Sequence, residues 1–363
     1  MPPQRPTIAD VARHAGVSKG AVSFALNGRD GVSDETRARI LEVARELGWQ
    51  PSHRARSLSV SRAFAVGLVL ARPPELLGAD PFYPSFIAGV ETVLSPAGFS
   101  LLLQVVPDAE AEAAGYKRLA AEGRIDGVFL SDLRTDDARI GVLTELELAA
   151  VTLNRPDGPS PFPALCADDR PGIGDAVRHL VQLGHERIAH VAGPLAFVHG
   201  RSRRDAWADA LKAAKLRRGR LVEADFTAAG GARATVRLLD VAEPPTAIVY
   251  ANDAMAIAGL SVAHNRGLRV PDDLSITGYD GTELASHIHP TLTTVQTNPF
   301  GWGQAAARTL LTVIERGTPL GIDDVVLDPP RLAVRESTAP PPRRRITGTA
   351  RRPSRAKSSK EST

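Results

Sequence analysis

The chain has 363 residues, 43% of them hydrophobic, which is enough sequence for more than one globular core. It contains no run of about 18 apolar residues for a membrane span, and its start, MPPQRPTIAD, lacks the apolar core of a signal peptide, so we expect a cytoplasmic protein. Cys166 is the only cysteine, which excludes an internal disulfide and a cysteine-rich zinc site.

The charge is unevenly distributed along the chain. Residues 1–62 carry ten Lys and Arg against six Asp and Glu, and residues 339–363 carry eight against one. Because the whole chain has a net charge of only +3, the part between these ends must be acidic, with a net charge of −8. Only the ends are therefore suited to contact a polyanion such as DNA.

Residues 7–27 have the pattern of two short helices joined by a sharp turn, as in a helix-turn-helix. Thr7 and Asp10 predict an N-terminal capping box, Gly16 supplies the turn, and Ser18 caps the second helix. The residues expected to face a shared core are Ile8, Val11, Ala12, Val22 and Leu26.

A third short helix is predicted from Ser33 to Gly48, and a basic segment over residues 49–62 follows it. Its expected core residues are Ile40, Val43 and Leu47. Three such helices also fit an ordinary bundle that reads no DNA. The segments that surround them decide between the two interpretations.

The rest of the chain alternates β-rich runs with helical patterns, which predicts parallel sheets covered by helices. The strands are expected at 64–70, 100–106, 127–130, 187–193, 246–251 and 274–280. The helices are expected near 84–97, 172–183, 203–214, 252–266 and 301–316. In open α/β sheets ligands bind beyond the carboxyl ends of the strands, so the loops after these strands are the place to look.

Enzyme signatures are weak in this sequence. It has no GxSxG elbow, no Walker loop and no HExxH motif, and His287 with His289 is the one hint of a metal site. We expect no catalytic role and no cofactor. A binding protein for a transporter would need an export signal in place of residues 1–62, which favour DNA binding instead.

Together, TIADVARHAGVS, ALNG, VSDETRARI and ARSL resemble the LacI family of bacterial transcription regulators, and the resemblance extends from Thr7 to about Thr338. It implies an α/β protein with a small all-α helix-turn-helix domain and a body like a periplasmic binding protein. The expected parts are a DNA-binding domain at 1–48, a hinge helix at 49–62, a body at 63–338 and a disordered basic tail at 339–363. Within the body we expect a subdomain boundary near 160 and a return of the chain near 290–330.

On the DNA side, the resemblance places the second helix in the major groove. Lys19 and Gly20 take the main specificity positions, and Phe24 stands where the family commonly has a base-reading arginine, so it contacts a thymine methyl or simply packs. The expected DNA-contacting residues of this domain are Thr7, Ser18, Lys19, Gly20, Ala21, Ser23, Phe24, Asn27, Ser33 and Thr36.

The segment at 49–62 is expected to form a hinge helix on operator DNA. There Arg54 reaches phosphate, Ala55 lies on the same face as Leu58, and Leu58 matches the family's leucine that wedges into the minor groove. The alternative is a flexible basic tether.

For the effector, the resemblance implies a cleft between two subdomains. Its expected ligand contacts are Phe82, Tyr83, Phe86, Asn154, Phe197, His199, Arg203, Phe226, Asn252 and Asp280. Of the trio Phe82, Tyr83 and Phe86, one is expected to pack in the core instead. Phe197 stands where purine-binding relatives have an arginine, which favours a sugar over a purine.

The sequence therefore predicts a homodimeric repressor that binds a pseudo-palindromic operator and responds to a small molecule, a sugar in the first instance. A nucleoside, a purine or a protein partner remains the alternative effector. The tail lacks the leucine heptads that join two dimers in some relatives, which favours a dimer. No membrane partner is expected.

Overall fold

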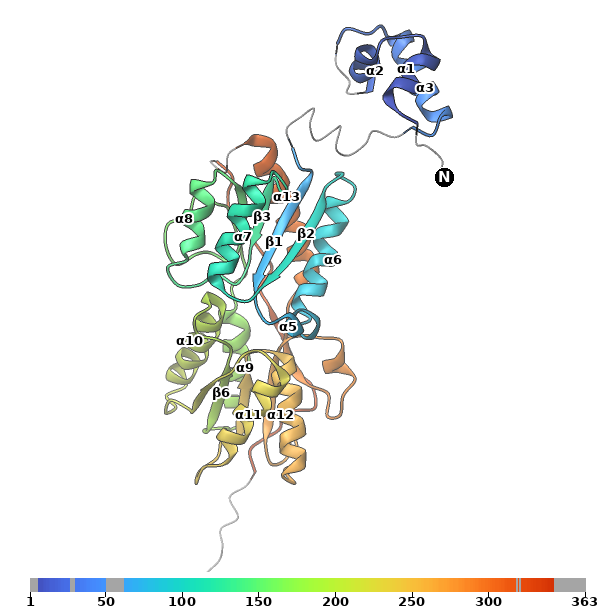
Figure 1. The fold of residues 1–363 in the computed structure, drawn as a ribbon. Coiled ribbons are helices and arrows are strands. Elements are labelled where there is room, and N and C mark those ends of the chain that lie inside the picture. Colours follow the sequence, from blue (N-terminus) through green and yellow to red (C-terminus); the bar gives the residue numbers. More distant parts are fainter. Residues whose placement is uncertain (1–5, 27–29, 50–61, 318, 320, 343–363) are drawn as a thin grey trace, which may run out of the picture. The chain divides into compact units, whose positions relative to one another are not determined.

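The computed structural model describes residues 6–26, 30–49, 62–317, 319 and 321–342 (Figure 1). The predicted contacts Asn27, Arg54, Ala55 and Leu58 and most of the basic tail lie outside these residues. The chain divides into two compact units, residues 1–64 and 65–363. Within the described ranges, no helix combines the length and apolar character that crossing a membrane requires.

The first unit is a three-helix domain. Its helices are α1 (Ile8–Ala15), α2 (Lys19–Leu26) and α3 (Asp34–Glu46). Thr7 and Asp10 form the predicted capping box, and Gly16 has a φ of 67°, which suits the turn between α1 and α2. The fully buried core residues are Val11, Ala12, Ala15, Val22, Ala25, Ile40 and Ala44, while Ile8, Leu26, Val43 and Leu47 pack at its edge.

The second unit begins with an α/β subdomain built on a parallel sheet. The order of its strands is β11-β5-β4-β3-β1-β2. The strands are β1 (Ala65–Ala71), β2 (Ser100–Val106), β3 (Gly127–Leu130), β4 (Ala149–Leu153), β5 (Ala164–Cys166) and β11 (Val325–Val326). The helices are α5 (Pro74–Ala79), α6 (Phe82–Leu94), α7 (Ala109–Ala121), α8 (Ala138–Glu145) and α13 (Pro299–Arg316). Helices α6 and α13 cover one face, and α7 and α8 cover the other (Figure 1).

The second subdomain repeats this plan with the strand order β12-β10-β9-β8-β6-β7. Its strands are β6 (Ile188–Ala192), β7 (Leu221–Glu223), β8 (Ala247–Tyr250), β9 (Ser275–Asp280), β10 (Thr293–Gln296) and the antiparallel β12 (Arg331–Ala333). Its helices are α9 (Arg170–Gln182), α10 (Val198–Ala213), α11 (Ala228–Leu239), α12 (Asp253–Asn265) and the short 3-10 helix Leu284–Ser286. The predicted fold class, a small helical domain and a body of parallel sheets, is confirmed.

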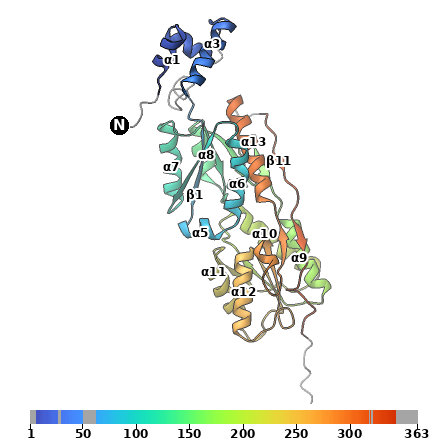
Figure 2. The same cartoon turned by 90° about the vertical axis from the view of Figure 1, so that its right-hand side faces the viewer.

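The chain passes between the two subdomains three times. After β10 in the second sheet, α13 packs against α6 in the first subdomain, and β11 then pairs with β5 (Figure 2). The chain returns to end in the second sheet with β12. In each sheet the strand order reverses at a switch point, between β1 and β3 and between β6 and β8, and ligands of such sheets bind there.

Candidate functional site

The exposed surface of α2 carries the residues expected to read DNA. Ser18, Lys19, Gly20 and Phe24 are exposed, and the phenyl ring of Phe24 is 41% exposed. The Oγ atom of Ser18 accepts a hydrogen bond from the Ala21 amide at 3.1 Å, so it caps α2 as predicted.

The other expected contacts of this domain hold the starts of helices. Thr7 caps α1 within its capping box, and Ser33 caps α3 by accepting from the Thr36 amide at 3.3 Å. Thr7 and Ser33 are exposed at helix N-termini, where backbone amides favour anions such as phosphate. Ala21 and Ser23 are partly buried on the same helix as Lys19.

A cavity of about 790 Å³, part of it open to solvent, lies between the two subdomains of the body. Both subdomains contribute residues that follow the carboxyl ends of their strands. Every residue expected to contact the effector lines this cavity except Phe86 and Phe197. Lining residues that the sequence analysis did not identify include Arg72, Asp80, Ser131, Asp132, Asp169, Tyr279, Thr297 and Trp302.

Arg203 forms the centre of the cavity wall in the second subdomain. Its guanidinium contacts the carboxylate of Asp169 at 3.2 Å and donates to the Ala251 carbonyl at 2.7 Å. It also lies 3.7 Å from the ring centroid of Tyr279, whose hydroxyl donates to Asp169 at 2.5 Å. Although burial opposes it, the combined interactions with Asp169, Tyr279 and Asp280 raise the pKa of Arg203 above its ordinary value. This arginine is therefore a fixed cation that is already neutralised.

Asn252 is buried and caps α12. Its side-chain oxygen accepts from the Met255 amide, and its amide group donates to the Phe226 carbonyl, both at 2.9 Å. The residue therefore borders the cavity but commits its carboxamide to the local structure. Phe226 itself has a φ of 64° and places its ring against Gly193.

Asp280 ends β9 with a φ of 120°, a backbone conformation that L residues rarely adopt. Burial, and then the nearby carboxylate of Asp253, raises the pKa of Asp280 well above its ordinary value. Asp253 accepts hydrogen bonds from Thr282 and Thr294, whereas Asp280 faces the cavity. Asp280 can therefore present either an acceptor or a proton to a ligand.

Arg72 and Asp132 form the matching ion pair of the first subdomain. Arg72 follows β1 and donates to both oxygens of Asp132 at 2.5 and 2.7 Å, and Tyr83 donates to the same carboxylate at 2.7 Å. Asp80 lies 3.6 Å from the guanidinium. Although burial opposes it, the charge of Arg72 holds the pKa of Asp132 well below its ordinary value. The position of these residues directly after β1 and β3 is the signal that could have identified them.

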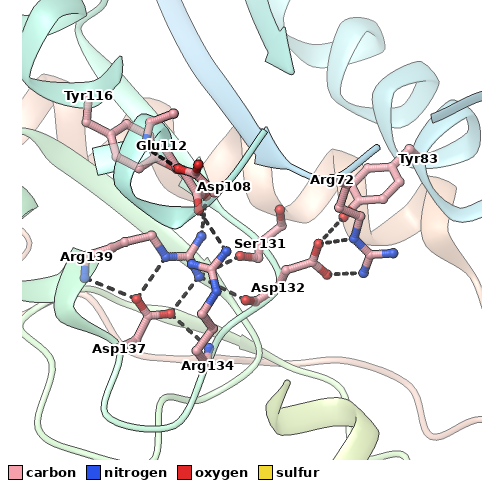
Figure 3. Close-up of polar contacts among 11 residues, drawn as sticks. Arg72, Tyr83, Asp108, Glu112, Tyr116, Ser131, Asp132, Arg134, Asp137 and Arg139 are labelled. Atoms are coloured by element: carbon pink, nitrogen blue, oxygen red, sulfur yellow. Dashed lines mark hydrogen bonds and ion pairs between the residues drawn. The ribbon is translucent and has the colours of Figure 1, made fainter. Parts of the chain in front are cut away.

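The loop that carries Asp132 is anchored from behind by a buried network (Figure 3). Arg139 donates to the carbonyls of Ser131 and Asp132 at 3.0 and 2.9 Å, and it pairs with the carboxylates of Glu112 and Asp137. Because the side chains of Arg139, Glu112 and Asp137 are buried and paired, the network holds the backbone of the loop in place.

The same loop reaches the second subdomain. Arg134 pairs with Glu112 at 3.0 Å and forms an isolated β-bridge with Phe197, and the Val198 amide donates to the Leu133 carbonyl at 2.8 Å. The cavity wall of the first subdomain is thus connected by backbone contacts to the start of α10.

Two of the expected ligand contacts need correction. Phe86 is 0% exposed and belongs to the core between α6 and the first sheet; Tyr83 is buried in the same core but also lines the cavity. Phe197 is not among the lining residues; its ring stacks on His199 at 5.5 Å between centroids and lies 5.1 Å from the Arg72 guanidinium. His199 does face the cavity and stacks on Phe226, also at 5.5 Å.

Asn154 and His199 complete the cavity lining that was expected. Asn154 follows β4 with a φ of 78°, and its side-chain oxygen accepts from the Ala167 amide at 3.4 Å. Burial, and then the charge of Arg203, lowers the pKa of His199 to about 4, so this side chain is neutral near pH 7. Within the described ranges, His287 and His289 belong to no cluster of three or more metal-binding side chains.

Comparison with known families identifies both units. The family model described as bacterial regulatory proteins, lacI family, matches residues 7–52. A model of a periplasmic binding protein-like domain matches residues 177–338.

Relatives match nearly the whole chain. The HTH-type transcriptional regulator CelR of Thermobifida fusca is 36% identical over 314 residues, which cover 85% of this chain and 92% of the relative. A solved CelR-cellobiose complex is 34% identical with a TM-score of 0.70, and it covers 92% of this chain and 100% of that chain. A lac repressor dimer bound to operator and the anti-inducer ONPF is 29% identical with a TM-score of 0.81, with coverage of 93% and 100%.

Proposed function

The chain belongs to the LacI family of bacterial regulatory proteins, and we propose that it is a repressor whose affinity for its operator changes when a carbohydrate occupies the cavity. It is a DNA-binding transcriptional regulator, as its relatives are, and it acts as a homodimer on a pseudo-palindromic operator. It regulates rather than catalyses, and it acts in the cytoplasm because its operator DNA is there.

The observation that carries the ligand class is the composition of the cavity wall. Aromatic rings of Phe82, Phe226 and Trp302 offer flat faces, and Asp80 and Asp280 offer polar groups around them. Pyranose rings bind to such walls because their C–H faces pack on aromatic rings while their hydroxyls form hydrogen bonds. CelR, a relative of this chain, has been solved with cellobiose.

We assign DNA reading to α2 and the segment that follows the helical domain. Lys19 donates to a guanine edge, Phe24 contacts a thymine methyl, and Ser18 and Ser23 contact phosphate. Leu58 inserts at the centre of the operator, where Arg54 and Ala55 accompany it. The exposure of Lys19 and Phe24 supports this assignment.

Selection of bound duplexes from a random pool at near-physiological salt tests the DNA side directly. We expect enrichment of a pseudo-palindrome with an easily kinked central step. Recovery of only unselective binding that falls steeply with salt would assign the basic ends a nonspecific role and contradict sequence reading by α2.

Addition of carbohydrates to the selected complex then tests the ligand. We expect at least one sugar to change the affinity for the selected duplex, since only a ligand that prefers one conformation can shift the equilibrium. A response to purines or nucleosides and to no sugar would establish the alternative effector instead.

A further inference from the structure

The cavity contains two copies of one polar arrangement, one from each subdomain. In each, an arginine pairs with a buried aspartate that also accepts a hydrogen bond from a tyrosine hydroxyl. The residues are Arg72, Asp132 and Tyr83 in the first subdomain, and Arg203, Asp169 and Tyr279 in the second. In each, the guanidinium also lies over the tyrosine ring, at 5.6 and 3.7 Å from the centroid.

These pairs leave no free positive charge in the cavity wall. Among the described lining residues, Arg72 and Arg203 are the only Lys or Arg side chains, and His199 is neutral near pH 7. Asp80 and Asp280 add two further carboxyl groups to the wall. Even if both hold a proton, the carboxylates of the two ion pairs match the guanidiniums, so the described lining residues carry no net positive charge near pH 7.

Among the described residues that line the cavity, one buried side-chain polar atom lacks a hydrogen-bond partner. Ser131 lines the cavity and is 2% exposed, and its Oγ atom has no hydrogen-bond partner among the described residues. Buried hydroxyls are nearly always hydrogen-bonded, so an orphan at a cavity wall indicates a ligand group that completes it. The Arg139 network holds Ser131 in place from behind (Figure 3). A ligand hydroxyl, which donates and accepts, fits both Ser131 and the carboxyl groups.

We infer that the cavity binds an uncharged, hydroxyl-rich ligand and rejects its phosphorylated counterpart, and that the Arg72–Asp132 ion pair sets this selectivity. The inference rests on the proposed carbohydrate effector and specifies its class. At Nε and Nη2 of Arg72, a phosphate would have to displace Asp132 and leave a buried carboxylate without its cation. At Nη1 it would meet the carboxylate of Asp80, which lies 3.6 Å away. A neutral sugar leaves both pairs intact and places a hydroxyl at Ser131.

Calorimetric titration of the full-length chain tests this with matched probes. The neutral series is cellobiose, maltose, lactose, sucrose and trehalose, and the charged series is the 6-phosphate esters of the same sugars. For each neutral sugar that binds, we expect its ester to bind at least about 100-fold more weakly at the same salt concentration.

Two variants locate the selectivity. Asp132→Asn frees the Arg72 cation, so we expect the preference for the neutral sugar to shrink at least tenfold. Asp80→Asn removes a second carboxylate near Arg72, so it should also reduce the preference for the neutral sugar, but by a smaller factor. It keeps the oxygen that accepts the hydrogen bond from the Phe82 amide. This variant provides the test if Asp132→Asn does not fold. Asp240→Asn is the matched control, because Asp240 pairs with Arg266 on the exposed surface. Thermal unfolding and operator binding show whether each variant is folded.

If the wild-type chain binds a phosphate ester as tightly as its parent sugar, or more tightly, the inference is overturned. The proposal of a carbohydrate effector would still stand. If both aspartate variants fold and keep the wild-type preference for the neutral sugar, the ion pair does not set the selectivity. Failure of both series, with operator binding intact, would overturn the carbohydrate effector and this inference with it.

Discussion

Because Gly193 has no side chain, the ring of Phe226 can pack directly against its backbone. A Cβ atom at Gly193 would lie 2.0 Å from Cζ of Phe226, and the three nearest heavy atoms all belong to that ring. The ring in turn forms part of the cavity wall. The close approach therefore fixes one face of the proposed ligand site.

Replacing Gly193 by alanine should push the Phe226 ring into the cavity. We expect a loss of about 1–3 kcal/mol in the free energy of unfolding, from overpacking, and weaker binding of the carbohydrate. Urea unfolding and calorimetry measure the two effects. Gly141→Ala is the control, because no atom lies within 4 Å of a Cβ there. Unchanged carbohydrate affinity in folded Gly193→Ala would show that Phe226 does not contact the ligand.

His190 gives the body a defined pH dependence. It is 0% exposed in β6, and burial lowers its pKa to about 4. The ordinary histidine pKa of about 6.5 applies in the unfolded chain, so the unfolded state takes up the proton first. The stability is complete above about pH 6.5 and falls as the pH decreases toward 4, by up to about 3 kcal/mol for this group.

Urea unfolding between pH 4 and 7.5 checks this. His190→Gln should reduce the number of protons that the chain takes up on unfolding in this pH range by up to about one. An unaltered pH dependence in His190→Gln would assign the effect to other buried histidines.

Asp280, which ends β9, and Asn252, which follows β8, were predictable because each lies at the carboxyl end of a strand. Arg203 lies within α10 and was identified through the family resemblance. Its partners Asp169 and Tyr279 were not identified, because the pairing joins segments far apart in sequence and only the folded sheet brings them together. The roles proposed for the predicted residues stay predictions until ligand and DNA binding are measured.

At the level of elements, α6 and α13 approach closely enough to require glycine on both sides. A Cβ atom at Gly303 would lie 2.1 Å from the Phe86 carbonyl oxygen, and one at Gly89 would lie 2.0 Å from the Phe300 carbonyl oxygen. Backbone atoms cannot move aside as a flexible side chain can. The contact therefore fixes the separation of these two helices.

Gly303→Ala should force the two helices apart and destabilise the first subdomain by about 1–3 kcal/mol or more. Hydrogen exchange of the α6 amides should accelerate, since their protection depends on this packing. Gly78→Ala, at a helix position with open space around it, is the control. Equal protection of α6 in wild type and Gly303→Ala would mean that the helices have room to adjust.

Long elements with strong apolar patterns were predicted within a few residues, as for β1, β2 and α13. Short strands such as β5 and β11 were missed, because two or three residues carry no periodicity and depend on their neighbours in the sheet. Helix α11 was missed since its sequence, AAGGARATVRLL, has two glycines of poor helix propensity in its first turn.

On the scale of the whole molecule, the two binding activities should respond differently to salt. Operator affinity should fall steeply between about 50 and 300 mM salt, because the basic ends displace counterions from DNA. Carbohydrate affinity should hardly change, since the cavity wall has no unpaired cation among its described residues. Parallel titrations measure both, and a chain ending at residue 342 gives the contribution of the tail. A steep salt dependence of carbohydrate binding would contradict a neutral ligand.

The threefold passage of the chain between the subdomains also bears on its synthesis. Strands β1 to β5 leave the ribosome early, yet their core includes Ala306, Leu310 and Val313 of α13, which is made only after the second sheet is almost complete. The subdomain that is translated first therefore cannot finish folding first, and its apolar face stays open while most of the other half is made. A chain interrupted before α13 cannot bury that face, which therefore stays accessible to proteases and chaperones. We expect incomplete repressor chains to be degraded for this reason.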